Sequence, residues 1–167
     1  MAPAPWIAVV GPGRDAAAAE LADAEDAGAA IAEAGAVLVC GGLRGVMEAA
    51  CRGARSRGGL TVGLLPGDDR EAANGWVVVA LPTGLGEARN VLIVRAVDAV
   101  VAVGGGWGTL SEIALALRAG LPVVGVGTWE LARAGTRVEG VVTAGDGRAA
   151  VAEALERVRH GSQPRAS

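Results

Sequence analysis

The 167-residue sequence contains no lysine, so all fifteen of its basic residues are arginines. Pyridoxal-phosphate enzymes need a lysine to form the Schiff base, and P-loop nucleotide hydrolases need one beside the phosphates. Both enzyme classes are therefore excluded. The net charge of −3 also argues against a broad surface for nucleic acid or anionic membrane, although a local arginine pocket remains open.

Tyrosine and phenylalanine are absent as well, and the aromatic residues are limited to Trp6, Trp76, Trp107 and Trp129. Half of the residues are apolar but very few are aromatic, so the core must consist of Val, Leu, Ile and Ala. Such a core suits a buried parallel sheet under closely packed helices. Two cysteines, Cys40 and Cys51, are too few for a zinc set and lack the CxxC spacing of a redox pair. We interpret both as core thiols and predict no metal site.

A targeting or membrane segment is also missing. The N-terminus MAPAPWIAVV lacks the basic part and the longer apolar stretch of a signal peptide, and no run approaches the ~20 apolar residues of a membrane span. We expect a cytoplasmic protein with no membrane partner. The length fits one domain, predicted over residues 1–160, and the polar residues 161–167 are expected to form a disordered tail.

Seven apolar segments recur along the chain, and their uniform hydrophobicity indicates strands buried on both faces. They cover residues 6–10, 36–40, 60–65, 76–80, 98–103, 121–126 and, more weakly, 140–143. Helices are predicted over residues 44–57, 86–97, 109–119 and 147–159 and in the Ala-rich segment after the first strand. This alternation predicts an α/β fold, a doubly wound, mostly parallel, Rossmann-like sheet of about seven strands with helices on both faces.

Two parts of this prediction are less regular. The Ala-rich helix places Leu21, Ala24, Gly28 and Ile31 on one face, and its small residues are expected to let it lie close to the sheet. Residues 65–76 are too few for a helical crossover, so we expect a loop there and leave the position of the fourth strand open.

Glycines follow three of the predicted strands. They are Gly11 and Gly13 after the first, Gly41 and Gly42 after the second, and Gly104, Gly105 and Gly106 after the fifth. Ligands of doubly wound sheets bind at this carboxyl edge, so a pocket is predicted where the loops meet, although βα turns also need glycine for backbone reasons. The first loop, GPGRDA, lacks the third glycine of a dinucleotide fingerprint, and no acidic residue ends the second strand, which disfavours NAD.

The third loop carries the sharpest signal. Residues 104–112, GGGWGTLSE, join a buried strand to a helix, so bare backbone and unpaired helix amides could hold a phosphate. Glu112 stands just inside this helix as a candidate catalytic acid. The alternative is a capping box, in which Thr109 and Glu112 only satisfy free amides at the helix start.

A second charged candidate is Arg89, which precedes the apolar residues VLIV. Its guanidinium cannot lose its proton and needs an anionic partner. That partner is either Glu112 or a ligand phosphate, whereas a surface pair with Glu87 is the structural alternative.

Several of these segments resemble the motifs of a known family. The segment GGGWGTLSE is similar to the PGGxGTxxE signature of the LOG family, long mislabelled lysine decarboxylases, and GGLRGVMEAA resembles its GGxxGLMGAVA segment. Arg89 falls where its ERK motif carries arginine. The resemblance implies a Rossmann-like fold, a dimeric unit and hydrolysis of the base–ribose bond of a nucleoside 5′-monophosphate. It makes Arg89 and Glu112 the catalytic pair, and it makes Gly105, Gly106, Gly108 and Thr109 the phosphate loop.

Two positions depart from the motif: Gly104 replaces its proline, and Asn90 replaces its lysine. These changes are similar to the subgroup that includes molybdenum-cofactor carrier proteins, which bind a phosphorylated pterin without needing to cleave it. The candidate ligand-binding set is therefore Gly11, Gly13, Gly41, Gly42, Asn90, Gly104, Gly105, Gly106, Trp107, Gly108 and Thr109.

The sequence thus predicts a protein that binds a phosphorylated nucleotide-like ligand at the glycine-rich loop. Two roles stay open. One is hydrolysis of a nucleoside 5′-monophosphate to the base and ribose 5-phosphate. The other is a non-catalytic carrier or sensor of a phosphorylated pterin, such as molybdenum cofactor, or of a nucleotide. We expect no resident cofactor and no nucleic-acid partner, and we expect assembly into a homodimer or higher homo-oligomer.

Overall fold

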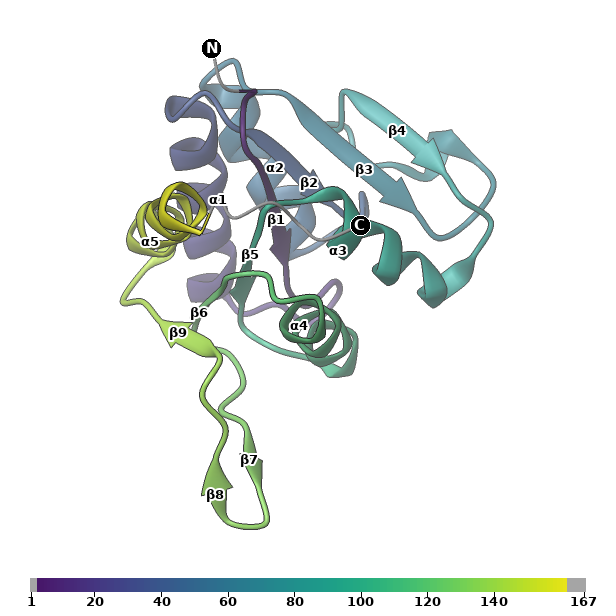
Figure 1. The fold of residues 1–167 in the computed structure, drawn as a ribbon. Coiled ribbons are helices and arrows are strands. Elements are labelled where there is room, and N and C mark those ends of the chain that lie inside the picture. The colour runs from purple at the N-terminus through teal and green to yellow at the C-terminus, as the bar shows by residue number, and fades with distance from the viewer. Residues whose placement is uncertain (1–2, 162–167) are drawn as a thin grey trace.

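The computed structural model describes residues 3–161, which form a seven-stranded parallel sheet between two layers of helices (Figure 1). The strands are β1 (Trp6–Val10), β2 (Val37–Cys40), β3 (Thr61–Leu65), β4 (Val79–Pro82), β5 (Ala99–Val103), β6 (Val123–Val126) and β9 (Val141–Thr143). Their order across the sheet is β4-β3-β2-β1-β5-β6-β9, and all neighbours are parallel. The predicted doubly wound, Rossmann-like fold is confirmed. The strand order reverses between β1 and β5.

The helices divide between the two faces of the sheet. On one face α1 (Ala18–Glu33), α2 (Val46–Ser56) and α5 (Gly147–His160) share an apolar core with β1, β2 and β5. On the other face α3 (Asn90–Ala96) and α4 (Trp107–Arg118) pack through Ile93, Val94, Ile113 and Ala116. Strand side chains alternate between these two cores, as the uniform apolar pattern predicts.

The small residues of α1 serve a different contact from the expected one. A methyl group added at Gly28 would overlap the carbonyl of Ala50, and one added at Gly53 would overlap the carbonyl of Glu25. These two glycines therefore allow α1 and α2 to cross with their backbones in contact. Sequence reasoning wrongly placed Gly28 against the sheet, because the helix pattern alone does not show which neighbour a small residue faces, whereas Ala24 and Ile31 do pack in the core that α1 shares with the strands.

The connection from β3 to β4 is the loop that the sequence predicts, interrupted by one 3₁₀ turn, η1 (Arg70–Ala72). It places β4 parallel to β3 at the sheet edge, which settles the position of the fourth strand. The strand begins at Val79, three residues later than the apolar segment suggests. The helix predicted over residues 86–97 is divided into a 3₁₀ turn, η2 (Gly86–Arg89), and α3.

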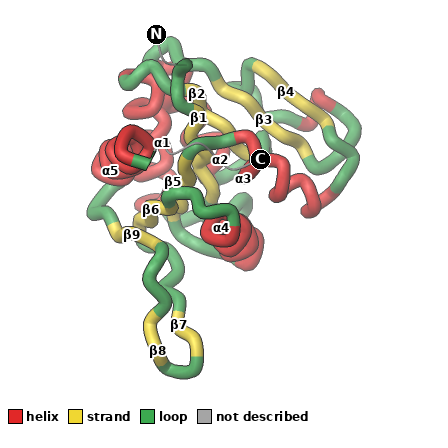
Figure 2. The backbone as a smooth tube through the Cα atoms, in the orientation of Figure 1, coloured by secondary structure: helices red, strands yellow, loops and turns green. Residues whose placement is uncertain are grey.

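An arm that the sequence analysis does not predict connects β6 to β9. We define the arm as residues 127–140, and it contains the antiparallel strands β7 (Ala132–Arg133) and β8 (Thr136–Arg137). Figures 1 and 2 show it projecting away from the sheet and its helices. The strand pattern is hard to recognise in sequence because each strand has only two residues.

Three smaller predictions concern other parts of the chain. Cys40 and Cys51 are fully buried, as predicted, and their sulfur atoms lie 3.5 Å apart. The predicted tail, residues 161–167, lies outside the described residues except for Gly161, which follows α5. Within residues 3–161, no helix is long and apolar enough to cross a membrane.

Candidate functional site

A cavity of about 590 Å³ lies at the carboxyl edge of the sheet, around the point where the strand order reverses. The three glycine loops meet there, as predicted. The predicted residues that line it are Gly11, Gly13, Gly41, Arg89, Asn90, Gly105, Gly106, Gly108, Thr109 and Glu112. The stretch from Gly105 to Thr109 is therefore open to an outside ligand.

Arg89 is the buried cation of this cavity. It ends η2, directly before α3, and is only 8% exposed. Its Nη1 donates a hydrogen bond to Asn90, whereas its buried Nε has no partner. Burial lowers the pKa of Arg89 and Glu112 opposes that effect, but a guanidinium stays charged at any physiological pH. A buried N–H without an acceptor costs free energy, so this group is suited to an incoming oxyanion.

Glu112 lies in the first half of α4 and is also 8% exposed. Its Oε1 is 4.0 Å from Arg89 Nη1, which is the outer limit of an ion pair. Burial raises the pKa of Glu112 to about 7, and the nearby charge of Arg89 offsets only part of that rise. Such a carboxyl can exchange a proton near neutral pH, which is the property required of a general acid or base.

The capping-box alternative for Thr109 and Glu112 is wrong. Helix α4 begins at Trp107, two residues earlier than predicted, with Gly106 at the N-cap and no side-chain hydrogen bond to the cap. The first helical bond runs from the N–H of Leu110 to the carbonyl of Gly106. The N–H groups of Trp107, Gly108 and Thr109 therefore have no carbonyl ahead of them in the helix, which is the arrangement that suits an anion at a helix start.

Glycine occurs at the different positions of this loop for different structural reasons. Gly104 has a φ of +62°, which favours glycine, and Gly105 leaves space for the indole of Trp129. In contrast, a Cβ at Gly106 or at Gly108 would meet no protein atom within 4 Å. No packing contact in the described structure requires glycine at these two positions, whereas bare backbone there leaves room for a ligand.

The loops after β1 and β2 also line the cavity, and each contains a glycine whose lack of a side chain is required. A side chain at Gly11 would collide with the carbonyl of Val103, so this glycine allows the loop to pass against the end of β5. A side chain at Gly41 would reach within 2.5 Å of Arg89 Nη2, so this glycine makes room for the guanidinium. Sequence reasoning assigned Gly41 to the ligand, but its clearest contact is with the cation of the site.

Asn90 connects Arg89 to the glycine loop. Its Oδ1 accepts the bond from Arg89, and its Nδ2 donates to Ser111 Oγ at 3.0 Å. Ser111 Oγ in turn donates to the carbonyl of Gly108 at 2.7 Å. Asn90 therefore fixes the orientation of Arg89 relative to the start of α4, in addition to lining the cavity.

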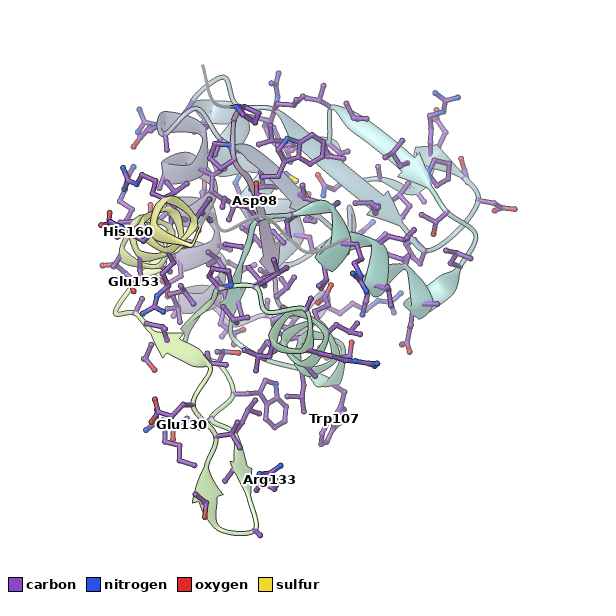
Figure 3. All side chains as sticks on the ribbon, viewed as in Figure 1. Asp98, Trp107, Glu130, Arg133, Glu153 and His160 are labelled. Carbon is purple, nitrogen blue, oxygen red and sulfur yellow. The ribbon has the colours of Figure 1, made fainter. Side chains whose placement is uncertain are left out.

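Three residues of the predicted ligand set do not line the cavity: Gly42, Gly104 and Trp107. Trp107 is 79% exposed and pairs with Trp129, with ring centroids 5.3 Å apart. Figure 3 shows its side chain extending from α4 into solvent. Trp129 Nε1 also donates to the carbonyl of Gly106, so the two indoles brace the loop from outside the cavity.

Sequence reasoning missed several charged residues at the cavity. Arg14, Asp15, Glu20 and Glu87 line it together with Leu43, Met47 and Pro66. Arg14 and Asp15 directly follow Gly13 and could have been found from their place after the first strand. Glu20 could not, because only the fold brings the first turn of α1 beside Gly104. Among residues 3–161, no group of three His, Cys, Asp or Glu side chains could hold a metal ion.

Comparison with protein-family models shows a match to the SLOG cluster4 family over residues 4–152. A curated relative, an uncharacterised protein of Archaeoglobus fulgidus, is 52% identical over 93 residues. That alignment covers 56% of this chain and 61% of the relative, so the chain spans about three fifths of the relative's length.

Two solved structures are similar over almost the whole chain. The molybdenum cofactor binding protein of Rippkaea orientalis is 36% identical with a TM-score of 0.83, covering 98% of this chain and 100% of that one. The Moco carrier protein of Chlamydomonas reinhardtii is 38% identical with a TM-score of 0.82, covering 95% and 99%. The residues that line the cavity all lie within residues 4–152, the span that the family model matches.

Proposed function

The chain belongs to the SLOG cluster4 family, and from this premise we propose that it carries a phosphorylated pterin of the molybdenum-cofactor type in the Arg89–Glu112 cavity. One observation carries the proposal. A buried guanidinium with an unpartnered Nε shares an open cavity with a helix start whose amides are free. Both groups bind oxyanions, and together they suit the phosphate of such a ligand.

The size of the cavity supports a ligand larger than phosphate alone. Sites for small organic molecules usually measure about 300–1,000 Å³, and this one measures about 590 Å³. The loop after β2 and the first turn of α2 add apolar contacts from Leu43 and Met47 beside the charged groups. This mixture of surfaces suits a heterocycle joined to a phosphate.

The similarity to carrier proteins supports the same ligand class. Both similar structures are described as binding or carrying molybdenum cofactor, and they match this chain along nearly its full length. The departures from the LOG motif, Gly104 and Asn90, agree with this choice. The closer relationship to the LOG family, a cytoplasmic location and the homo-oligomeric state remain parts of the proposal.

A second candidate function is phosphoribohydrolysis of a nucleoside 5′-monophosphate. It is favoured by the pKa of Glu112, about 7, and by the absence of a capping role for this residue. In this reaction water adds its hydroxyl to C1′ and its proton goes to the departing base. Ionised Glu112 would orient the water or stabilise the positive charge that develops at C1′.

One experiment separates the two functions. The purified full chain is titrated with molybdenum cofactor released from a molybdoenzyme, and in parallel it is incubated with AMP while ribose 5-phosphate is assayed. A carrier binds the pterin without turnover of AMP. Release of ribose 5-phosphate that disappears in Glu112→Gln would instead establish the hydrolase.

A matched pair of variants tests the site itself. Arg89→Gln should weaken pterin binding, whereas Arg52→Gln removes a half-buried arginine that pairs with Glu25 away from the cavity and should not. Equal affinities of these two variants, or no pterin binding by the unmodified chain, would overturn the carrier proposal.

A further inference from the structure

The ligand cavity contains more acidic groups than a phosphate site requires. Among the described residues, four carboxyl groups and only two guanidinium groups line it. Arg89, buried and with an unpartnered Nε, accounts for the phosphate end of the ligand. Carboxylates repel a phosphate, so the acidic groups need hydrogen-bond donors on another part of the ligand. The four carboxyl groups belong to Asp15, Glu20, Glu87 and Glu112.

Glu20 is a carboxylate of this cavity whose position is fixed and whose charge is not paired. Its Oε2 accepts a hydrogen bond from the N–H of Ala17 at 2.8 Å, and its Oε1 lies against Gly104. Within residues 3–161, no ion pair joins this partly buried side chain to an arginine. Asp15 and Glu87, in contrast, are exposed. Glu20 therefore provides a preorganised acceptor for a donor on the ligand.

Gly104 makes room for this carboxylate. A Cβ at Gly104 would overlap Glu20 Oε1, and the φ of Gly104, +62°, is one that proline cannot adopt. The LOG motif has proline at this position. A chain with proline there could not hold a carboxylate in the same place, so the departure at Gly104 and the position of Glu20 belong together.

Arg89 and Glu20 lie at opposite ends of the cavity. Gly41, after β2, makes room for the guanidinium, and Gly104, after β5, makes room for the carboxylate. Strand β1 lies between β2 and β5, so two strand spacings, roughly 10 Å, separate the two strand ends. The helices that carry the two side chains also approach from opposite faces of the sheet. A ligand whose phosphate is at Arg89 therefore reaches Glu20 with its other end.

We propose that Glu20 recognises the ring of the ligand and selects a 2-amino-4-oxopyrimidine, the ring type of pterins and of guanine. Such a ring presents two adjacent donors, a ring N–H and an amino group, which match the two oxygens of a carboxylate. Oε2 keeps a free lone pair for this purpose after it accepts from Ala17. Adenine places a ring lone pair beside its amino group, and hypoxanthine has no amino group. The inference rests on the proposed function and names the part of the ligand that determines specificity.

Calorimetric titration of the full chain with GMP, IMP and AMP tests this selection, because the three nucleotides share the ribose phosphate and differ at the ring edge. The unmodified chain should bind GMP at least about tenfold more tightly than IMP or AMP, since a missing donor leaves an acceptor of the site unpaired. In Glu20→Gln the affinities for GMP and IMP should agree within about twofold. The glutamine oxygen can still accept from Ala17, so its amide donor faces the donors of the ring.

Gly104→Ala tests the same contact from the other side. Its methyl group displaces the Glu20 carboxylate and should lower the ratio of GMP to IMP affinity to the value of Glu20→Gln. The double variant should lower this ratio no further, because both substitutions act on one contact. The strain of a positive φ at alanine affects both nucleotides alike and cancels in the ratio.

Glu48→Gln is the matched control. Glu48 is the third residue of α2, as Glu20 is of α1, and it is partly buried but does not line the cavity. The ratio of GMP to IMP affinity should not change in this variant. Absence of GMP binding, equal affinities of the unmodified chain for GMP and IMP, or a GMP preference that persists in Glu20→Gln would each overturn the inference. A chain that binds molybdenum cofactor but does not distinguish GMP from IMP would keep the carrier function and lose only this role of Glu20.

Discussion

Arg89 Nη1 and Glu112 Oε1 lie 4.0 Å apart inside the ligand cavity, where both side chains are about nine-tenths buried. At this separation the two groups attract each other but make no hydrogen bond, so neither charge recovers the full cost of leaving water. A shorter ion pair would stabilise the fold better. The arrangement instead leaves Arg89 available to an anion and keeps Glu112 close to its titration point.

The pH dependence of stability follows from Glu112. Burial raises its pKa from 4.5 to about 7, so between these values the folded state binds more protons than the unfolded state. The free energy of unfolding should therefore fall as pH rises from about 4.5 through 7, by on the order of 3 kcal/mol, and should show no further loss from this group above about pH 8.

Urea denaturation from pH 4.5 to 9 of the unmodified chain and of Glu112→Gln measures this effect. The variant should lack this decline and should be more stable than the unmodified chain above pH 7. Glu153→Gln, which alters a half-buried glutamate of α5 that pairs with Arg157, serves as the control. Parallel pH profiles of the unmodified chain and Glu112→Gln would show that Glu112 does not titrate in this window.

Anion binding should depend on the same two residues. Sulfate stays a dianion across this pH range, so its affinity reports the protein alone. Binding should weaken on the order of tenfold between pH 6 and 8, as Glu112 gains its negative charge beside the ligand. In Arg89→Gln the affinity should fall about tenfold to a hundredfold at pH 6, because a charge-assisted hydrogen bond is lost.

Isothermal titration calorimetry with sulfate provides the measurement, and Arg52→Gln is the matched control. Glu112→Gln should bind sulfate at pH 8 as tightly as the unmodified chain does at pH 6. A sulfate affinity that stays constant with pH in the unmodified chain would show that the charge of Glu112 has no effect on the anion site.

The sequence was sufficient for the fold class because most strands are buried on both faces. Uniformly apolar segments such as residues 98–103 have one physical explanation in a chain of this size, and glycines after them mark the carboxyl edge of the sheet. The proximity of Arg89 and Glu112 could also be expected from the sequence, since an arginine at the start of an apolar helix needs an anionic partner.

Other features could not be predicted from the sequence and became evident only in the three-dimensional structure. The Thr109–Glu112 spacing fits a capping box, but α4 begins at Trp107, earlier than the apolar periodicity suggests, with Gly106 at the N-cap. Glu20 reaches the cavity only through tertiary packing. The roles of individual glycines were likewise invisible in the sequence, because packing and backbone conformation are properties of the neighbours in space.

Alanine substitution can distinguish a loop glycine that faces open space, Gly106, from one that packs against a side chain, Gly105. Gly106 has a φ of −117°, and an added Cβ would meet only open space, so Gly106→Ala should change the free energy of unfolding by less than about 0.5 kcal/mol. It should nevertheless weaken sulfate binding, because the methyl group occupies the ligand side of the loop. Gly105→Ala pushes against the indole of Trp129 and should lower the free energy of unfolding by about 1–3 kcal/mol.

Urea denaturation and sulfate titration of both variants make the comparison. Loss of stability in Gly106→Ala equal to that in Gly105→Ala would assign both glycines to packing. Unchanged sulfate affinity in Gly106→Ala would remove this backbone from the anion site.

The bridge from Arg89 through Asn90 to Ser111 should act as one unit. Asn90→Ala removes the acceptor that orients the guanidinium and should weaken sulfate binding about tenfold, since a buried hydrogen bond to a charged group is lost. Ser111→Ala removes only the outer link, which runs to the carbonyl of Gly108, and should weaken binding less. The double variant should bind no more weakly than Asn90→Ala, because the two side chains act in series.

Ser56→Ala is a close control for Ser111→Ala, because Ser56 Oγ also donates to a helical carbonyl at 2.7 Å, that of Gly53, and does not line the cavity. It should leave sulfate affinity unchanged. Calorimetric titration of the three bridge variants gives the coupling directly. Additive losses from Asn90→Ala and Ser111→Ala would mean that each residue acts on the anion by itself. The bridge would then not be what aligns Arg89 with the start of α4, and the buried guanidinium would owe its orientation to the space beside Gly41 instead.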